Sequence, residues 1–253
     1  MTAGRRLVRV LAAGALAVAA GSCSSTYGLP ESATEQGREI ADVWGTFMVA
    51  AFVVAGIVYA LIVWSLLRYR RRRDDTPDAF GRQFHANVPI EVVYTAIPIL
   101  IVIGLFVVSA DVDRFVTGTD GEPYVVLEAT AFSWGWRFEY PDLGVVIVSE
   151  PSSREDPGPE IAMPLGETTR VVLRSNDVVH AFWVPAFNFK RDAVPGRATE
   201  FDLTPVEEGV YRGVCAEFCG LNHAFMTFRV RTASPEAFDV WISERAEAAE
   251  AVP

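Results

Sequence analysis

Apolar residues gather in one short and two long runs in the first half of the chain. The first run follows a basic start and ends in small residues at Cys23, a pattern typical of an export signal. The other two runs cover residues 44–67 and 88–110. Each is long enough to cross a bilayer, which takes about 20 residues. The pattern therefore predicts a signal over residues 1–23 and two transmembrane helices.

The polar segments around these runs decide the topology. Residues 68–87 begin with the arginine cluster "RYRRRR", and such positively charged loops stay on the cytoplasmic side. Residues 24–43 and the chain beyond residue 110 then lie on the outer face. The export signal predicts the same topology independently.

The periodicity changes between residues 120 and 232. Short runs rich in Val, Thr and aromatic residues, such as "YVVLEATAF" and "FMTFRVRT", alternate with Pro and Gly turns. That spacing is typical of an antiparallel β-sandwich or barrel of about one hundred residues. Residues 233–253 have a helical pattern, with Ser234 as N-cap and Pro235 in the first turn. We therefore expect a membrane α-hairpin, an all-β domain and a short C-terminal helix.

Composition narrows the classes of partner. The 253 residues are 51% hydrophobic and have a mean hydropathy of +0.23, which agrees with part of the chain lying in lipid. A formal net charge of -10 argues against a nucleic-acid partner and favours solubility or a cationic partner. Three cysteines are too few for a disulfide framework.

Candidate chemistry is concentrated in "GVCAEFCGLNHAFM", near the end of the predicted β-domain. The outer face of the membrane allows a disulfide between its two cysteines, but a disulfide needs neither histidine nor methionine. Thiolate, imidazole and thioether donors together select copper. The four candidate donors are Cys215, Cys219, His223 and Met226.

A further ligand is expected from elsewhere in the fold. Of the three histidines, His85 falls on the cytoplasmic side, which leaves His180. A remote histidine followed by a Cys-His-Met cluster is the blue-copper arrangement, but a mononuclear blue site uses one cysteine. Two bridging thiolates would instead hold two copper ions as one centre, with Met226 and a backbone carbonyl as weak donors. The competing interpretation, a plain disulfide, leaves the other donors unexplained.

The motifs "CAEFCGLNHAFM", "DVVHAFWVP" and "DAVPGR" resemble subunit II of the haem-copper cytochrome c oxidases. The resemblance covers nearly the whole mature chain and implies a cupredoxin Greek-key domain with a binuclear copper centre of the CuA type. Quinol-oxidising relatives lack these ligands. The resemblance also implies that the Glu217 side chain reaches a magnesium ion at the border with subunit I. The implied copper ligands are His180, Cys215, Cys219, His223 and Met226, with the main-chain oxygen of Glu217.

The resemblance further implies a role and a set of partners. Cytochrome c or a cytochrome bc complex would give electrons to the copper centre. Haem in subunit I would receive them, and would reduce oxygen to water while protons are pumped. Subunit III and membrane lipid would be further partners, in the cell membrane of a bacterium with the β-domain outside. The style of the sequence, rich in arginine and alanine, is typical of an actinobacterium.

The stretch "FSWGWRFEYP" resembles the family's aromatic region for electron uptake. Trp134 falls where the family has the tryptophan through which cytochrome c passes its electron. Ser133 replaces a frequent Gln, and Gly135 stands where an aromatic residue is usual. We expect Trp136 to pack in the core, and Glu139 fits an acidic docking face.

Two positions outside the β-domain carry separate hypotheses. Glu91 is a carboxylate one turn inside a membrane span, where such groups are costly. By resemblance it lies at the mouth of a proton path into subunit I, and the alternative is that it reaches back to the interface. Cys23 ends an Ala-Gly-Ser-Cys box that resembles a lipidation site, although Ala20 stands where Leu is more usual. The alternatives for Cys23 are ordinary cleavage or an uncleaved start.

Two other functions use similar donors. A membrane-anchored copper carrier or insertion protein would favour exposed ligands that release the metal. A nitrous-oxide reductase-type domain shares the dicopper motif but does not account for the two-span hairpin.

Overall fold

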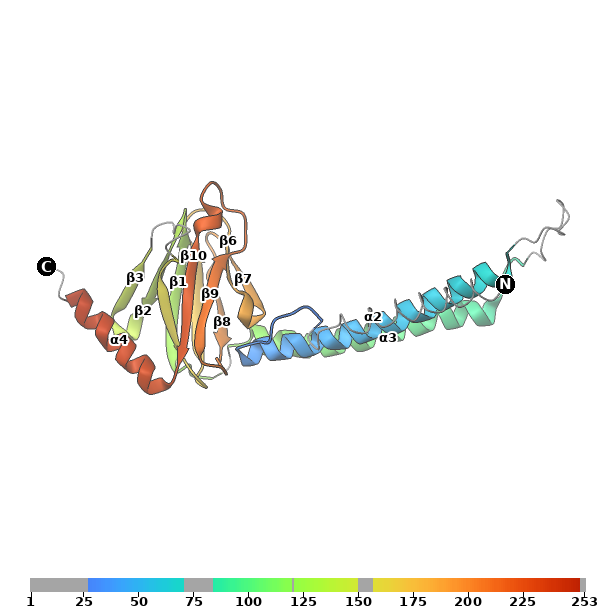
Figure 1. Ribbon diagram of the computed structural model, residues 1–253, viewed down its shortest axis with the longest axis horizontal. Helices are drawn as coiled ribbons and strands as arrows, with labels where there is room; N and C mark the ends of the chain where they lie inside the picture. Colours follow the sequence, from blue (N-terminus) through green and yellow to red (C-terminus); the bar gives the residue numbers. More distant parts are fainter. Residues whose placement is uncertain (1–26, 71–83, 120, 150–156, 251–253) are drawn as a thin grey trace, which may run out of the picture. The chain divides into compact units, whose positions relative to one another are not determined.

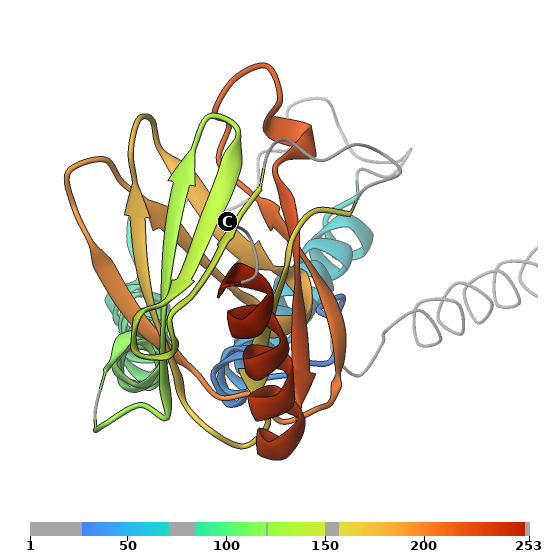
Figure 2. The same ribbon diagram turned by 90° about the vertical axis from the view of Figure 1, so that its left-hand side faces the viewer.

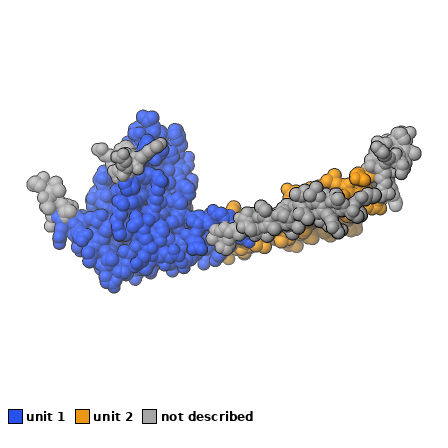
Figure 3. All heavy atoms as spheres, viewed as in Figure 1, with its two compact units in different colours: residues 1–42, 113–253 blue, residues 43–112 orange. Residues whose placement is uncertain are grey.

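The computed structural model describes residues 27–70, 84–119, 121–149 and 157–250. The expected export signal, Cys23 and most of the arginine-rich loop lie outside the described residues. The chain divides into two compact units, drawn in two colours in Figure 3. One comprises residues 43–112, and the other comprises residues 1–42 and 113–253.

Two long apolar helices, α2 (Glu35–Arg68) and α3 (Val88–Thr117), supply the helical unit. Both are long and apolar enough to cross a membrane, which confirms the helical part of the predicted fold class. Each helix extends beyond its apolar run, at the start of α2 and at the end of α3. A hydropathy pattern does not predict these extensions, because they contain polar residues.

Local capping explains where both helices begin. The Thr34 hydroxyl accepts a hydrogen bond from the Gly37 N–H, at 3.2 Å, and so acts as the N-cap of α2. At the start of α3, the Asn87 N–H donates to the Glu91 carboxylate at 2.9 Å, and the Asn87 side chain accepts from Ile90 N–H at 3.5 Å. This reciprocal pair resembles a capping box. Glu91 therefore has a structural role at the helix start.

The β-domain is a sandwich of two five-stranded sheets, visible from two sides in Figures 1 and 2. The first sheet has the order β3-β2-β1-β5-β8 and the second has the order β4-β10-β9-β6-β7. Strands of the first sheet are β1 (Val125–Phe132), β2 (Gly135–Tyr140), β3 (Val145–Val148), β5 (Thr169–Ser175) and β8 (Thr199–Leu203). Strands of the second sheet are β4 (Glu160–Pro164), β6 (His180–Val184), β7 (Phe189–Ala193), β9 (Gly209–Cys215) and β10 (Thr227–Ala233).

Two strand pairs are parallel, β1 with β5 and β4 with β10, and the other pairs are antiparallel. The expectation of an antiparallel sandwich did not include these two pairs. Parallel neighbours cannot be joined by a tight turn, so each pair is connected through strands that lie between its members in the sequence. The β-sandwich itself confirms the predicted fold class.

Aromatic rings join the two sheets at the centre of the sandwich. Trp136 of β2 is fully buried, and its ring lies 5.3 Å from that of Phe228 of β10 and 6.1 Å from that of Phe182 of β6. The rings of Phe182 and Phe228 are 4.8 Å apart. Trp136 therefore packs in the core, as predicted.

The C-terminal helix α4 (Pro235–Glu250) lies against the sandwich (Figure 2). The Ser234 hydroxyl accepts a hydrogen bond from the Ala237 N–H at 3.3 Å, which confirms the predicted N-cap. Phe238 and Trp241 are buried, and their rings lie 6.2 Å and 6.1 Å from the ring of Tyr140. These contacts bury the apolar face of the helix.

The segment that precedes α2 is part of the β-domain unit. Ala33 N–H donates to the Ala186 carbonyl at 2.9 Å, and Glu35 N–H donates to the Thr204 carbonyl at 3.0 Å. Thr204 N–H in turn donates to the Gln36 side chain at 3.0 Å. The first turn of α2 is thus hydrogen-bonded to the loop after β8. The sequence assigned no role to this segment.

We predict that Gly37→Ala destabilises this junction. A Cβ at Gly37 would overlap the Phe187 carbonyl oxygen and the Ser32 hydroxyl, both inside the packed segment. Overpacking of this kind costs about 1–3 kcal/mol, so thermal unfolding of the full chain in detergent should begin at a lower temperature. Gly45→Ala is the control, because a Cβ there meets nothing within 4 Å. Equal melting of both variants would contradict the prediction.

Candidate metal centre

The candidate ligands meet at one end of the second sheet. His180 is the first residue of β6, and Cys215 is the last residue of β9. Because β6 and β9 are antiparallel, with Phe182 opposite Cys215, these two ends come together. The chain then leaves β9 in a loop and returns through Met226 into β10. The Cys215 N–H donates to the Met226 carbonyl at 2.9 Å and closes the base of this loop.

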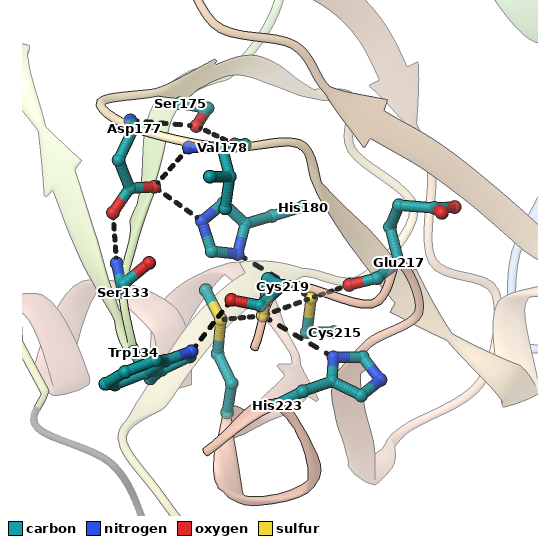
Figure 4. Close-up of polar contacts among 11 residues, drawn as sticks. Ser133, Trp134, Ser175, Asp177, Val178, His180, Cys215, Glu217, Cys219 and His223 are labelled. Atoms are coloured by element: carbon teal, nitrogen blue, oxygen red, sulfur yellow. Dashed lines mark hydrogen bonds and ion pairs between the residues drawn. The ribbon is translucent and has the colours of Figure 1, made fainter. Parts of the chain in front are cut away.

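The donor atoms form a connected cluster (Figure 4). The Cys215 and Cys219 sulfurs are 3.9 Å apart. Each sulfur has an imidazole nitrogen beside it: His180 Nδ1 lies 3.8 Å from the Cys215 sulfur, and His223 Nδ1 lies 3.5 Å from the Cys219 sulfur. The Met226 sulfur is 3.9 Å from that of Cys219. The sequence-predicted donors are therefore brought together.

The spacing of these donors suits a metal. Nitrogen and sulfur ligands bind tetrahedral metals at about 2.0–2.3 Å, which places neighbouring ligand atoms roughly 3.5 Å apart. The observed separations of 3.5–3.9 Å are close to that value. A ligand set of thiol, imidazole and thioether groups favours copper over hard cations. The residues present therefore fit a soft metal centre.

Both cysteines are free thiols, and both are buried. Their sulfurs are much farther apart than the roughly 2.05 Å of a disulfide bond. His180 and Met226 are also buried, with exposed fractions of 0% and 1%, whereas His223 is half-buried. The cluster therefore lies below the surface, with His223 on its outer side.

The two thiols differ in acidity. Burial raises the pKa of Cys215, but its contact with His180 and the neighbouring main-chain groups outweigh burial and lower the pKa. Burial and the neighbouring Cys215 raise the pKa of Cys219. Removal of the second proton would place two negative sulfurs 3.9 Å apart, so the two protons leave as a coupled pair. Bound cations would compensate that repulsion.

Sequence reasoning missed Asp177, whose carboxylate lies 2.8 Å from His180 Nε2. Partial burial raises the pKa of Asp177, but hydrogen bonds from His180, from Val178 N–H and from Ser133 outweigh it and lower the pKa to about 2. Burial lowers the pKa of His180, and its contacts with Cys215 and Asp177 raise it by more. The spacing Asp-x-x-His in "DVVH" was the signal available in the sequence.

Trp134 lies in the turn between β1 and β2, on the other sheet, yet it contacts the ligand loop. Its indole N–H donates to the Cys219 carbonyl at 2.9 Å. Gly220 has a φ of +115°, and a Cβ there would approach the indole to 3.1 Å. The glycine therefore lets the loop turn closely around the ring.

The main-chain oxygen and the side chain of Glu217 point in different directions (Figure 4). Its main-chain oxygen lies 3.3 Å from the Cys215 sulfur, close to the donor cluster. Its side chain points away from the sulfurs and is 44% exposed, with the Lys190 ammonium 3.9 Å from the carboxylate. The carboxylate therefore faces the surface beside Lys190.

Other candidate residues belong to other elements. Glu139 is on β2, where it pairs with Arg137 at 2.5 Å and stands opposite Glu128 in the sheet. Glu91 and His85 belong to the helical unit.

Fold and site together define a membrane-anchored, cupredoxin-like β-sandwich with a two-cysteine metal site. The family "Cytochrome C oxidase subunit II, periplasmic domain" matches residues 125–233, and "Cytochrome C oxidase subunit II, transmembrane domain" matches residues 22–112. The chain is 32% identical to "Probable cytochrome c oxidase subunit 2" of Streptomyces avermitilis, over 96% of this chain and 88% of that protein. Accordingly, the chain belongs to the cytochrome c oxidase subunit II family.

One further relative agrees with this assignment, and one solved structure is similar to part of the chain. "Cytochrome c oxidase subunit 2" of Mycobacterium tuberculosis is 30% identical, over 95% of this chain and 82% of that protein. The periplasmic domain of subunit II of cytochrome oxidase (CoxB) of Bradyrhizobium japonicum is 30% identical with a TM-score of 0.47, over 51% of this chain and 99% of that one. The chain is thus a membrane-bound subunit of an oxidase that also contains other subunits.

Proposed function

We propose that this chain is the electron-accepting subunit of a terminal cytochrome c oxidase. Electrons from cytochrome c, or from a cytochrome bc complex, would reach two copper ions on this chain. They would pass to haem in subunit I, where oxygen is reduced to water and protons are pumped. Subunit III and membrane lipid complete the proposed surroundings, on the outer face of a bacterial cell membrane.

One observation carries the proposal: each of two neighbouring thiols has an imidazole nitrogen beside it, within 3.5–3.8 Å. A single copper would need only one such pair, whereas two bridging sulfurs with two imidazoles suit two metals. The proposed ligands are His180, Cys215, Cys219, His223 and Met226, with the main-chain oxygen of Glu217.

When bound, such a copper pair supplies a one-electron acceptor and donor whose charge is shared by two metals. The chain's own residues hold the ligands in place and keep water out, because four of the five donor side chains are buried. Trp134 offers the contact between the surface and a ligand, through its hydrogen bond to the Cys219 carbonyl.

Three further roles remain proposals. The exposed Glu217 carboxylate is suited to a magnesium ion shared with subunit I, since Mg²⁺ prefers carboxylate oxygens. Glu91 would receive protons at the mouth of a path into subunit I. Lipidation of Cys23 would add a second membrane anchor.

Burial of the donors argues against a copper carrier. A carrier must hand over its metal, and His180, with none of its surface exposed, offers no route for exchange. Copper that leaves the full chain readily to a mild external chelator would support the carrier instead.

Cys219→Ser tests the shared pair. Loss of one bridging sulfur should leave fewer than two copper ions per chain and remove the delocalised signal. An electron shared equally by two copper nuclei gives a seven-line EPR pattern and near-infrared absorption. Metal analysis and EPR of the purified oxidase measure both. The binuclear proposal fails if the variant keeps both copper ions and the seven-line pattern.

Trp134→Phe tests electron uptake. Phenylalanine keeps an aromatic ring but loses the N–H that reaches Cys219, so reduction by cytochrome c should slow roughly tenfold or more, a loss of the size that a small misplacement of reacting groups causes in catalysis. The copper EPR spectrum should stay unchanged, because Trp134 is not a ligand. Trp183→Phe, an exposed tryptophan of the same domain, is the matched control. Uptake at the normal rate would remove Trp134 from the route.

Glu91→Gln separates proton uptake from helix capping. Glutamine keeps an oxygen that can accept from Asn87 N–H but cannot take up a proton, whereas Glu91→Ala loses both roles. We expect turnover of the oxidase to fall severalfold in both variants, while the helix content measured by circular dichroism stays normal in the Gln variant. Full turnover in Glu91→Gln, with loss only in Glu91→Ala, would limit this residue to capping.

A further inference from the structure

The turn that carries Trp134 belongs to the first sheet, whereas the metal ligands belong to the second. Two hydrogen bonds join the turn to the ligand region. One is the bond from the Trp134 indole to the Cys219 carbonyl, at 2.9 Å. The other runs from the Ser133 N–H to an oxygen of the Asp177 carboxylate, at 2.6 Å. The turn is therefore held at two neighbouring residues.

The two oxygens of Asp177 have different partners. Oδ2 accepts from Ser133 N–H, whereas Oδ1 accepts from Val178 N–H at 2.7 Å and lies 2.8 Å from His180 Nε2. The Asp177 N–H donates to the Ser175 hydroxyl at 3.3 Å, and that hydroxyl donates to the Val178 carbonyl at 2.5 Å. The carboxylate is thus fixed by its own loop before it contacts either partner (Figure 4).

The same carboxylate decides how His180 presents its ring. A neutral imidazole has one N–H and one lone pair, and a carboxylate at Nε2 favours the proton on that nitrogen. The lone pair of Nδ1 then faces the Cys215 sulfur, 3.8 Å away. Carboxylates that contact the outer nitrogen of a ligating histidine fix its ring orientation and its tautomer.

We propose that Asp177 is a positioning residue that holds the ligand His180 and the Trp134 turn in one fixed arrangement, one with each carboxylate oxygen. This inference rests on the proposed function for Trp134 and His180 as parts of an electron route. A carboxylate is required because both of its oxygens accept. No other side chain of similar size has two oxygens that both accept hydrogen bonds and carry no proton.

Asp177→Asn separates the contact with Ser133 from the contact with His180. The amide has one oxygen and one NH₂ group. If the oxygen takes the place of Oδ1, it still accepts from Val178 N–H and His180, but the NH₂ then meets the Ser133 N–H and that contact is lost. The reverse orientation would break two contacts and keep one. The variant should therefore release the Trp134 turn and keep His180 in place.

The first measurement is hydrogen–deuterium exchange at the Ser133 amide in the full-length, metal-free chain in detergent. Loss of a hydrogen bond to a charged group should speed exchange about tenfold or more. Asp142→Asn is the matched control, because it makes the same charge change at an exposed residue beyond the far end of β2. Unchanged exchange at Ser133 in Asp177→Asn would overturn the proposal. This result does not depend on copper or on the oxidase reaction.

The second measurement uses the loaded oxidase. Asp177→Asn should lower the rate of electron uptake at saturating cytochrome c severalfold, with an unchanged KM and a retained copper EPR pattern. Asp177→Ala should also alter the EPR pattern, because it releases His180. A raised KM with a normal maximal rate would instead make Asp177 a docking charge and would overturn its positioning role. A further outcome is that Trp134→Phe takes up electrons normally while Ser133 exchange still rises in Asp177→Asn. In that case the proposed electron route fails, and the positioning role of Asp177 stands.

Discussion

The site depends on one constraint, the pairing of β9 with β10 on either side of the ligand loop. The ladder continues up to Val214 opposite Thr227, and the Cys215 N–H to Met226 carbonyl bond adds one more step. The loop cannot open without breaking that ladder, so its donors stay close together. Pairing of β6 with β9 then brings in His180 from a distant part of the sequence. Strand pairing therefore brings the donors together.

Burial of so many polar groups is costly unless each finds a partner. His180 meets this requirement on both sides, since one ring nitrogen faces Cys215 and the other faces Asp177. The Cys219 carbonyl accepts the Trp134 N–H. The contacts that satisfy buried polar groups are therefore the same contacts that join the metal site to the turn at the surface.

The sequence predicts the parts of the site that lie close together in the chain or that belong to a rare residue type. Cys215 and Cys219 stand on one short segment, and His180 follows because the sequence has three histidines and His85 is expected on the cytoplasmic side. The contact of Asp177 with Ser133 could not be predicted, because it spans 44 residues and depends on where the β1–β2 turn lies. The sequence also does not predict the two parallel strand pairs or the packed segment before α2, because both arise from tertiary contacts. The cap of α3 could have been predicted, because the polar residue Asn87 stands four positions before Glu91.

The departures from the family pattern beside Trp134 have a physical explanation. Ser133 donates its main-chain N–H to Asp177, a contact that every residue except proline can make, so this part of the contact does not depend on the side chain. Gly135 is constrained in the opposite way. A Cβ there would overlap the Ser149 carbonyl oxygen and crowd the Phe132 ring, which leaves no room for an aromatic side chain. The main-chain contact of Ser133 and the indole hydrogen bond of Trp134 therefore hold the ring against the ligand loop.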